Sequence, residues 1–236
     1  MNPRIAMISG AGRGLGAAIA ERLLADGWSV SLGMRDVAKA QAAFEDKAPG
    51  RVLCCRFDAV DFATARSWVD QTVAHFGRID ALVNNAGILR MVDFEQGSED
   101  DLDDLWAVNV KAPFRLIRAA LPHLKETGQG RVVNIASTDA KRFRGGTSVG
   151  YSMTKHALLA MTQAVRFAGW DQGVRATAMC PGAIDTDLIA NAPSATPKAD
   201  RLTPETVAGM VAFVLTLPNQ ASVPELISNT RLESFI

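Results

Sequence analysis

Short apolar runs alternate with longer amphipathic stretches along most of this chain, and that alternation limits the folds open to it. The apolar runs have the length of buried strands, and the stretches between them have the length and spacing of helices. Parallel strands need a long crossover connection, usually a helix, so strand–helix alternation indicates a parallel sheet. Because such crossovers are right-handed, the helices cover both faces. We therefore expect an α/β fold built on a doubly wound parallel sheet of about seven strands.

The pattern also locates the elements. The expected strands cover residues 4–9, 28–34, 51–57, 80–87, 130–137, 174–182 and 223–228. Apolar residues at helical spacing predict helices over residues 14–26, 67–77, 98–124, 150–169 and 203–218. Pro113 should bend the third of these helices, because proline removes a backbone donor. Without repeats or low-complexity segments, the chain is expected to form a single domain over residues 1–236.

Composition and charge argue against several kinds of partner. The 25 basic and 25 acidic residues balance to zero, which gives no reason to expect nucleic acid or an acidic membrane surface. No apolar run is long enough to cross a bilayer. Cys54 and Cys55 are neighbours in an expected strand and Cys180 stands alone, which indicates reduced thiols. The histidines lack metal-ligand spacing. We expect a cytoplasmic protein without a metal site.

A glycine-rich turn follows the first expected strand and opens the first helix. Its residues expected to contact a ligand are Gly10, Gly12, Arg13, Gly14, Leu15 and Gly16. Glycines let the backbone approach a pyrophosphate, and the N–H groups of a helix N-terminus attract its negative charge. The turn therefore predicts a dinucleotide site, although its spacing differs from the common G-x-G-x-x-G. A tight turn without a ligand is the alternative.

The end of the second strand bears on the choice of cofactor. An NAD site offers a carboxylate to the ribose 2′-hydroxyl there, whereas an NADP site offers arginine to the 2′-phosphate. Met34 stands where the carboxylate is expected, Arg35 follows it, and Arg13 adds a second cation. Two guanidinium groups on one phosphate favour NADP(H). Asp36, one position further on, leaves NAD(H) open as the alternative.

The only tyrosine of the chain, Tyr151, stands four residues before Lys155. Residues at this spacing lie on one face of a helix. An ammonium beside a phenol stabilises the phenolate, so we expect Lys155 to lower the pKa of Tyr151. Such a phenol is suited to exchange a proton with a carbonyl or an alcohol. A core tyrosine beside a solvated lysine is the alternative.

Six motifs in order give the chain a resemblance to a known family. They are the turn Ser9–Gly16, the segment Asn84–Gly87, Asn109, Ser137, the pair Tyr151 and Lys155, and the stretch Pro181–Thr186. With these, the chain resembles the compact single-domain type of short-chain dehydrogenase/reductase from about Ile5 to Thr186. The resemblance implies a Rossmann-type fold and hydride transfer between a nicotinamide cofactor and a carbonyl or alcohol.

The resemblance also implies roles for the site residues. Tyr151 is the general acid/base, Lys155 lowers its pKa and binds the nicotinamide ribose, and Ser137 polarises the substrate carbonyl. Asn109 holds a water that links Lys155 to solvent. Because the interval from Ser137 to Tyr151 is one residue longer than usual, Thr138 is a rival for the polarising hydroxyl.

Further cofactor contacts carry over from the family. The resemblance assigns them to Asp58, Ala59, Asn85, Ala86, Gly87, Pro181, Gly182, Ile184 and Thr186, besides Met34, Arg35, Tyr151 and Lys155. Asn84 is expected to tie strands together rather than contact the ligand. The C-terminus lacks the Gly-Gly that many members carry, which leaves the C-terminal part of the pocket and one possible oligomer interface unassigned.

Three segments are expected to form the walls of the substrate pocket. They are Leu89–Val92, the loop after Ser137, and an insertion over residues 186–200 that is either a lid or an ordinary surface loop. Within the loop after Ser137, Lys141, Arg142 and Arg144 either attract an anionic substrate or are solvated charges.

We therefore expect an NADP(H)-dependent oxidoreductase that interconverts a carbonyl and an alcohol of a small-molecule substrate. The alternative is a non-catalytic NADP(H)-binding regulatory or scaffold protein, although such a protein has no need of the acid/base residues. By analogy with the family, whose long apolar helices pair subunits, a homodimer or homotetramer is expected.

Overall fold

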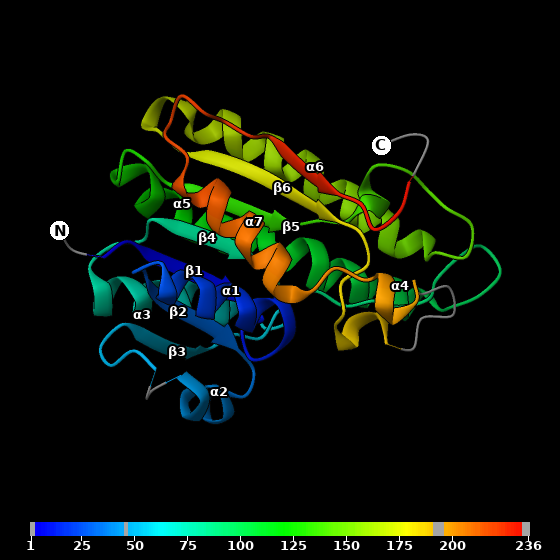
Figure 1. The fold of residues 1–236 in the computed structure, drawn as a ribbon, viewed down its shortest axis with the longest axis horizontal. Coiled ribbons are helices and arrows are strands. Elements are labelled where there is room, and N and C mark those ends of the chain that lie inside the picture. The colour runs from blue at the N-terminus through cyan, green and yellow to red at the C-terminus, as the bar shows by residue number, and fades with distance from the viewer. Residues whose placement is uncertain (1–2, 45–46, 191–195, 233–236) are drawn as a thin grey trace.

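Seven parallel strands form the central sheet of a computed structural model that describes residues 3–44, 47–190 and 196–232 (Figure 1). The strands are β1 (Ile5–Ser9), β2 (Ser29–Met34), β3 (Val52–Arg56), β4 (Ala81–Asn84), β5 (Arg131–Ile135), β6 (Arg175–Pro181) and β7 (Glu225–Ser228). Their order across the sheet is β3-β2-β1-β4-β5-β6-β7, and every neighbouring pair is parallel. Each strand lies within its predicted range.

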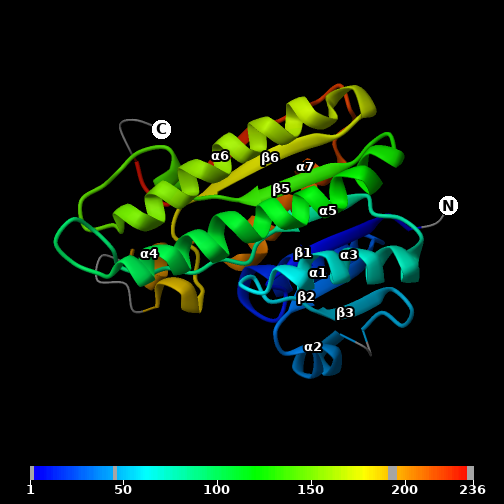
Figure 2. The same ribbon diagram turned by 180° about the vertical axis from the view of Figure 1, so that it is seen from behind.

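Helices cover both faces of this sheet. They are α1 (Gly14–Ala25), α2 (Val37–Phe44), α3 (Phe62–Phe76), α4 (Glu99–Trp106), α5 (Ala112–Glu126), α6 (Val149–Gly169) and α7 (Pro204–Thr216). Figure 1 shows α1 and α7 in front of the sheet, and Figure 2, from behind, shows α3, α5 and α6 in front. The doubly wound, Rossmann-type α/β fold expected from the sequence is confirmed.

Each face of the sheet has its own apolar core. Successive residues of a strand point to opposite faces, so Ile8 packs with α1 and α7 in one core, while Met7 packs with α3 and α5 in the other. The neighbours Cys54 and Cys55 are divided in the same way, and both are free thiols.

Two helices differ from their predicted ranges. Helix α2 was not predicted, since its sequence has few large apolar residues. Helix α3 begins at Phe62, five residues before the predicted start at residue 67, because the Asp61 side chain accepts a hydrogen bond from the Ala63 N–H and caps the helix there.

The helix that contains Pro113, which the sequence predicts to be bent, is irregular one turn before this proline. A π-helical segment, Ala107–Lys111, lies between α4 and α5. Pro113 stands in the first turn of α5, which continues directly from the π-helical segment, so its ring and its missing N–H act on the turn that contains Asn109, four residues earlier. The irregularity therefore falls one turn earlier, around Asn109.

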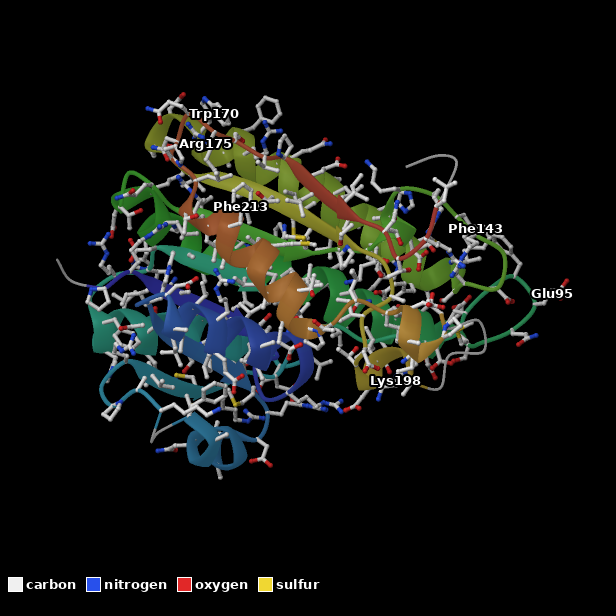
Figure 3. All side chains as sticks on the ribbon, in the orientation of Figure 1. Glu95, Phe143, Trp170, Arg175, Lys198 and Phe213 are labelled. Atoms are coloured by element: carbon white, nitrogen blue, oxygen red, sulfur yellow. The ribbon has the colours of Figure 1, made fainter. Side chains whose placement is uncertain are left out.

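The carboxyl ends of the strands meet at one end of the molecule. From β1, the chain adds β2 and β3 on one side of the sheet and then returns to add β4 on the other side of β1. Such a switch point leaves a crevice beyond the carboxyl ends, which is where open α/β sheets bind ligands. In Figure 3, the labelled Glu95, Phe143 and Lys198 surround this end, while Trp170 and Arg175 lie at the opposite end.

Candidate active site

A cavity of about 770 Å³ opens at the carboxyl ends of the strands. A volume in the upper part of the usual range for ligand pockets suits a large ligand. It is lined by the predicted residues Gly10, Gly12, Arg13, Gly14, Leu15, Met34, Arg35, Asp58, Ala59, Asn85, Ala86, Gly87, Ser137, Tyr151, Lys155, Pro181, Gly182, Ile184 and Thr186. Gly16 and Asn109 are the predicted site residues outside this lining.

The N-terminus of α1 is suited to bind an anion. Among the described helices α3, α4, α6 and α7, a side chain caps the first turn in each case, but α1 has no such cap and no acidic residue in its first turn. Gly10 reaches this turn with a φ of 68°, in the left-handed region that glycine tolerates. Gly14 and Leu15, which begin α1, line the cavity, so a pyrophosphate fits at this uncapped end.

Gly16, which is predicted to contact the cofactor, lies outside the cavity lining and is constrained by packing. A Cβ at Gly16 would lie 2.3 Å from the Gly10 carbonyl oxygen and 2.6 Å from the Asn85 amide nitrogen. The absence of a side chain therefore lets α1 lie directly on the glycine turn.

Ser9 and Asn85 join the glycine turn to the end of β4. The Ser9 hydroxyl accepts hydrogen bonds from the Asn85 and Ala86 N–H groups, each at 3.0 Å. The Asn85 amide donates to the Ser9 and Gly10 carbonyls. Asn84 instead donates to Asn134 across β4 and β5, as predicted, and lies outside the cavity lining. These bonds fix the two turns against each other without using a ligand.

The cavity also holds the predicted cofactor contacts that follow β2 and β3. Met34, Arg35 and Asp36 line it after β2, and Asp58 and Ala59 line it after β3. The guanidinium of Arg13, which the sequence assigned to a phosphate, forms an ion pair with Asp187 in the loop after β6. Both side chains are about three-quarters exposed (75% and 73%), so this pair is weak and exchangeable.

Tyr151 lies in the first turn of α6, which is anchored to the segment after β4. Ser148 caps the helix by accepting from the Tyr151 N–H at 3.1 Å, and its hydroxyl also contacts the Val92 backbone. The Gly150 N–H donates to the Val92 carbonyl at 3.1 Å. Val92, predicted to be a pocket wall, is buried in this anchor and lies outside the cavity lining.

Lys155 lies one turn along α6 with its ammonium turned into the protein. Its Nζ donates to the Ile135 carbonyl at 2.7 Å and lies 5.3 Å from the centroid of the Tyr151 ring. The side chain lines the cavity although the residue is only 5% exposed. Burial lowers the pKa of Lys155 to about 8, so its charge is held less firmly than that of an exposed lysine.

The pKa of Tyr151 differs from the sequence-based expectation. Burial raises the pKa of Tyr151 above its ordinary value, and the Asp139 carboxylate raises it further, whereas the hydrogen bond from Ser137 lowers it. The expected lowering by Lys155 does not prevail, because desolvation of the phenolate outweighs a lysine that is itself buried. Tyr151 is therefore a protonated phenol at neutral pH, the form that can donate a proton.

Ser137 and Thr138, the two candidates for the polarising hydroxyl, have different hydrogen-bond partners. The Ser137 hydroxyl hydrogen-bonds to Tyr151 and accepts from the Asp139 N–H at 3.0 Å. The Thr138 hydroxyl instead accepts from Arg142 at 3.4 Å. Both residues line the cavity, but the geometry favours Ser137 as the partner of the phenol.

Asn109 supports helix α6 from the π-helical segment. Its side-chain oxygen accepts from the Ile88 N–H at 2.9 Å, and its amide donates to the Ile88 carbonyl and to Thr154. Thr154 in turn donates to the Tyr151 carbonyl at 2.8 Å. Sequence analysis missed Thr154, although its place three residues after Tyr151 puts it on the helix side that faces Asn109.

The basic loop after Ser137 divides into three different environments. Lys141 forms an ion pair with Glu225 at 2.6 Å and lies outside the cavity lining. Arg142 pairs with Asp139 at 2.6 Å, and both line the cavity. Arg144 also lines the cavity.

The remaining walls include residues that sequence analysis did not assign. Leu89, Arg90 and Met91 form one wall as predicted, and Leu188, Ile189 and Thr196 come from the predicted insertion, whose residues 191–195 lie outside the described residues. Ala183, Val108 and Asp104 also line the cavity, as do Thr230 and Arg231. A Cβ at Gly182 would lie 3.2 Å from the Thr230 nitrogen. The C-terminal segment therefore contributes to the cavity although it has no Gly-Gly signal.

Comparison with known proteins defines the class. Residues 4–196 match the family described as short chain dehydrogenase. The chain therefore belongs to the short-chain dehydrogenase/reductase family, an oxidoreductase family, and a nicotinamide cofactor is supported by its structural neighbours.

Particular relatives show the range of this likeness. The chain is 41% identical over 221 residues to agropine synthesis reductase of Rhizobium rhizogenes, covering 93% of this chain and 51% of that protein. The chain thus spans about half the length of this relative.

Two solved structures share the whole fold. An alcohol dehydrogenase of the archaeon Thermococcus sibiricus, complexed with 5-hydroxy-NADP, has a TM-score of 0.86 and 29% identity, with 95% of each chain covered. The 3-ketoacyl-(acyl-carrier-protein) reductase of Brucella melitensis, complexed with NADH, has a TM-score of 0.87 and 27% identity, covering 96% of this chain and 97% of that one.

In the described part of this chain, no helix is long and apolar enough to span a membrane.

Proposed function

We propose that this protein is an NADP(H)-dependent oxidoreductase that interconverts a carbonyl and an alcohol. The observation that carries the proposal is the meeting of Tyr151, Ser137 and Lys155 in the same cavity as the glycine turn. A protonated phenol beside a serine hydroxyl provides a proton donor and a second hydrogen-bond donor for one substrate oxygen.

In this proposal the protein residues handle the proton and the developing charge. Bound NADPH supplies hydride to the carbonyl carbon. The Tyr151 phenol donates its proton to the substrate oxygen, and Ser137 hydrogen-bonds to the same oxygen. The Lys155 ammonium stabilises the phenolate that remains, and Asn109 and Thr154 hold the helix that carries both residues. In the direction of oxidation, Tyr151 takes the proton back.

The preference for NADP(H) over NAD(H) rests on Arg35 and Arg13. Arg35 lines the cavity directly after β2, where the 2′-phosphate of NADP would lie, and Met34 offers no carboxylate to a ribose hydroxyl. Arg13 is within the adjoining turn and is held only by an exposed pair with Asp187. A charge-assisted contact to phosphate discriminates by roughly 10- to 100-fold.

We further propose that the protein is cytoplasmic, that its chain forms a single domain, and that it assembles into a homo-oligomer. The free cysteines of the described chain suit a reducing compartment. Phe114 on α5 and Met153 on α6 are half exposed (54% and 46%), as apolar residues of a helix-paired interface would be in one isolated subunit. A homodimer or homotetramer would cover them.

The test is cofactor oxidation with NADPH and NADH at equal concentration against aldehydes, ketones and keto acids. We expect turnover with NADPH, a loss of at least about 1,000-fold in kcat in Tyr151→Phe, and NADPH binding within about twofold of the unmodified protein. Arg35→Gln should weaken NADPH by about 10-fold or more and leave NADH nearly unchanged. Tight NADPH binding without turnover of any carbonyl would instead support a non-catalytic sensor.

A further inference from the structure

Arg144 lies midway along the loop that joins the two catalytic hydroxyls. It is seven residues after Ser137 and seven before Tyr151, and all three residues line one cavity. Figure 3 shows the adjacent Phe143 at the end of the molecule to which the strands point. Arg144 is therefore a cation of the substrate side, away from the glycine turn.

The backbone of Arg144 is fixed to the start of the catalytic helix. Its carbonyl accepts hydrogen bonds from the Thr147 hydroxyl at 2.6 Å and from the Thr147 N–H at 3.2 Å. The next residue, Ser148, caps α6 through the Tyr151 N–H. The position of Arg144 relative to Tyr151 is thus set by a short, hydrogen-bonded connection.

The charge of Arg144 is not compensated as those of its neighbours are. Lys141 has Glu225 and Arg142 has Asp139, each at 2.6 Å. Across residues 3–44, 47–190 and 196–232, no carboxylate forms an ion pair with Arg144.

Part of the Arg144 guanidinium is also removed from water. Its Nε is shielded from solvent and makes no hydrogen bond within the described structure. A solvated loop charge would keep its water, whereas this group has lost water at one nitrogen without gaining an acceptor there. Desolvating a cation is unfavourable unless an anion compensates it.

We propose that Arg144 binds a carboxylate of the substrate, so that this protein acts on carbonyl compounds that carry an acid group. The inference rests on the proposed carbonyl–alcohol activity and names its substrate class. Leu89, Met91 and Leu188 also line the cavity and provide apolar contacts for a carbon chain between the carbonyl and the acid. Arg142 stays with Asp139 and orders the loop.

The test compares acids with neutral molecules of nearly the same shape. The probes are levulinate and its next two longer homologues, each against its methyl ester, with NADPH as cofactor. We expect kcat/KM to be at least about 10-fold higher for the best acid than for its ester, because a charge-assisted hydrogen bond to arginine is lost in the ester. Arg144→Gln should lower this acid/ester ratio by about 10-fold or more, mostly through KM.

Lys141→Gln is the matched control, because Lys141 is a cation of the same loop that lies outside the cavity. It should leave the acid/ester ratio within about twofold of the unmodified protein. An unchanged ratio in Arg144→Gln, an equal change in Lys141→Gln, or no preference for the acid in the unmodified protein overturns the inference.

A binding measurement keeps the inference testable even if none of these ketones is reduced. Calorimetry with hexanoate and with hexanamide, on the protein saturated with NADPH, should detect binding of the acid alone and its loss in Arg144→Gln. Absence of hexanoate binding, or equal binding by the variant, contradicts the role of Arg144. Failure of the proposed activity is recognised separately, as no NADPH oxidation with neutral ketones or aldehydes.

Discussion

The two sides of the cavity are built from different parts of the chain. On the cofactor side, backbone makes the surface: Gly10 turns through a positive φ, Gly16 lets α1 lie on the turn, and Ser9 binds two backbone N–H groups. On the substrate side, side chains make the surface: some are apolar, such as Leu89 and Leu188, and several charged ones are paired with each other, as in Arg142 with Asp139.

This difference separates what is constrained from what can change. Where backbone packs against backbone, as at Gly16, there is no room for an added atom, so the turn keeps one shape and serves one ligand class. A surface of paired side chains can be altered one charge at a time, and so it can be adapted to different substrates on the same scaffold.

The largest effect is expected when a methyl group is added to one glycine on each side of the cavity. In Gly16→Ala the new Cβ meets the Gly10 carbonyl oxygen at 2.3 Å, and the clash outweighs the gain of about 1 kcal/mol in helix propensity. We expect a loss of about 3 kcal/mol in the free energy of unfolding, measured by urea denaturation. In Gly145→Ala no atom lies within 4 Å of the new Cβ, and the change should stay below about 0.5 kcal/mol. Equal losses in both variants would show that the two sides are equally constrained.

The pH dependence sharpens the comparison at Tyr151 and Lys155, where the two sides meet. The pKa of Lys155 is lowered to about 8, so this lysine is charged below about pH 8 and neutral above it. The pKa of Tyr151 is raised, so the phenol remains a proton donor across the same range. We expect kcat/KM for reduction to be flat below about pH 8 and to fall by up to about tenfold per pH unit above it. Alcohol oxidation should rise with pH instead. Reduction that increases above pH 8 would contradict this assignment.

The smallest expected effect concerns the ion pair that joins the two sides. Asp187→Asn removes the carboxylate that holds Arg13 and leaves its guanidinium available to a phosphate. Since an exposed pair contributes at most about 1 kcal/mol, we expect the Kd of NADPH to fall by about two- to fivefold, with little change for NADH. Asp185→Asn is the control, because Asp185 pairs with Arg201 and Lys198 in the same loop. Weaker NADPH binding in Asp187→Asn would mean that Arg13 does not contact the 2′-phosphate. Fluorescence titration with both cofactors measures these constants.

Local signals explain what could be predicted from the sequence. The seven strands follow from apolar runs, and the neighbourhood of Tyr151, Lys155 and the glycine turn follows from parallel strands whose carboxyl ends meet. The packing constraint on Gly16 and the raised pKa of Tyr151 were missed for a common reason. Both depend on what packs against the residue from elsewhere in the chain, which spacing along the sequence does not contain.

The same limit applies to the charges. Nothing near Lys141 in the sequence indicates Glu225, which is 84 positions away, and nothing near Arg13 indicates Asp187. Helix α2 was missed because its apolar periodicity is weak, and the π-helical segment was missed because its periodicity shifts by one residue. Hydrophobic pattern predicts elements well where they are regular, and long-range pairing determines the rest.

Because of the π-helical segment, the position of Asn109 in the site depends on the number of residues that precede it in the helix. Each residue turns an α-helix by about 100°, and the wider turn at Ala107–Lys111 absorbs about one extra residue. Removing one residue there would restore a regular helix but rotate either α4 or α5 by that angle. If α4 rotated, Leu105 would lose its contact with Gly150. If α5 rotated, Leu116 and Ala120 would leave the core beneath α3. Substitutions are therefore easier to accommodate in this stretch than insertions or deletions, and chimaeras with related enzymes should be joined outside residues 99–126.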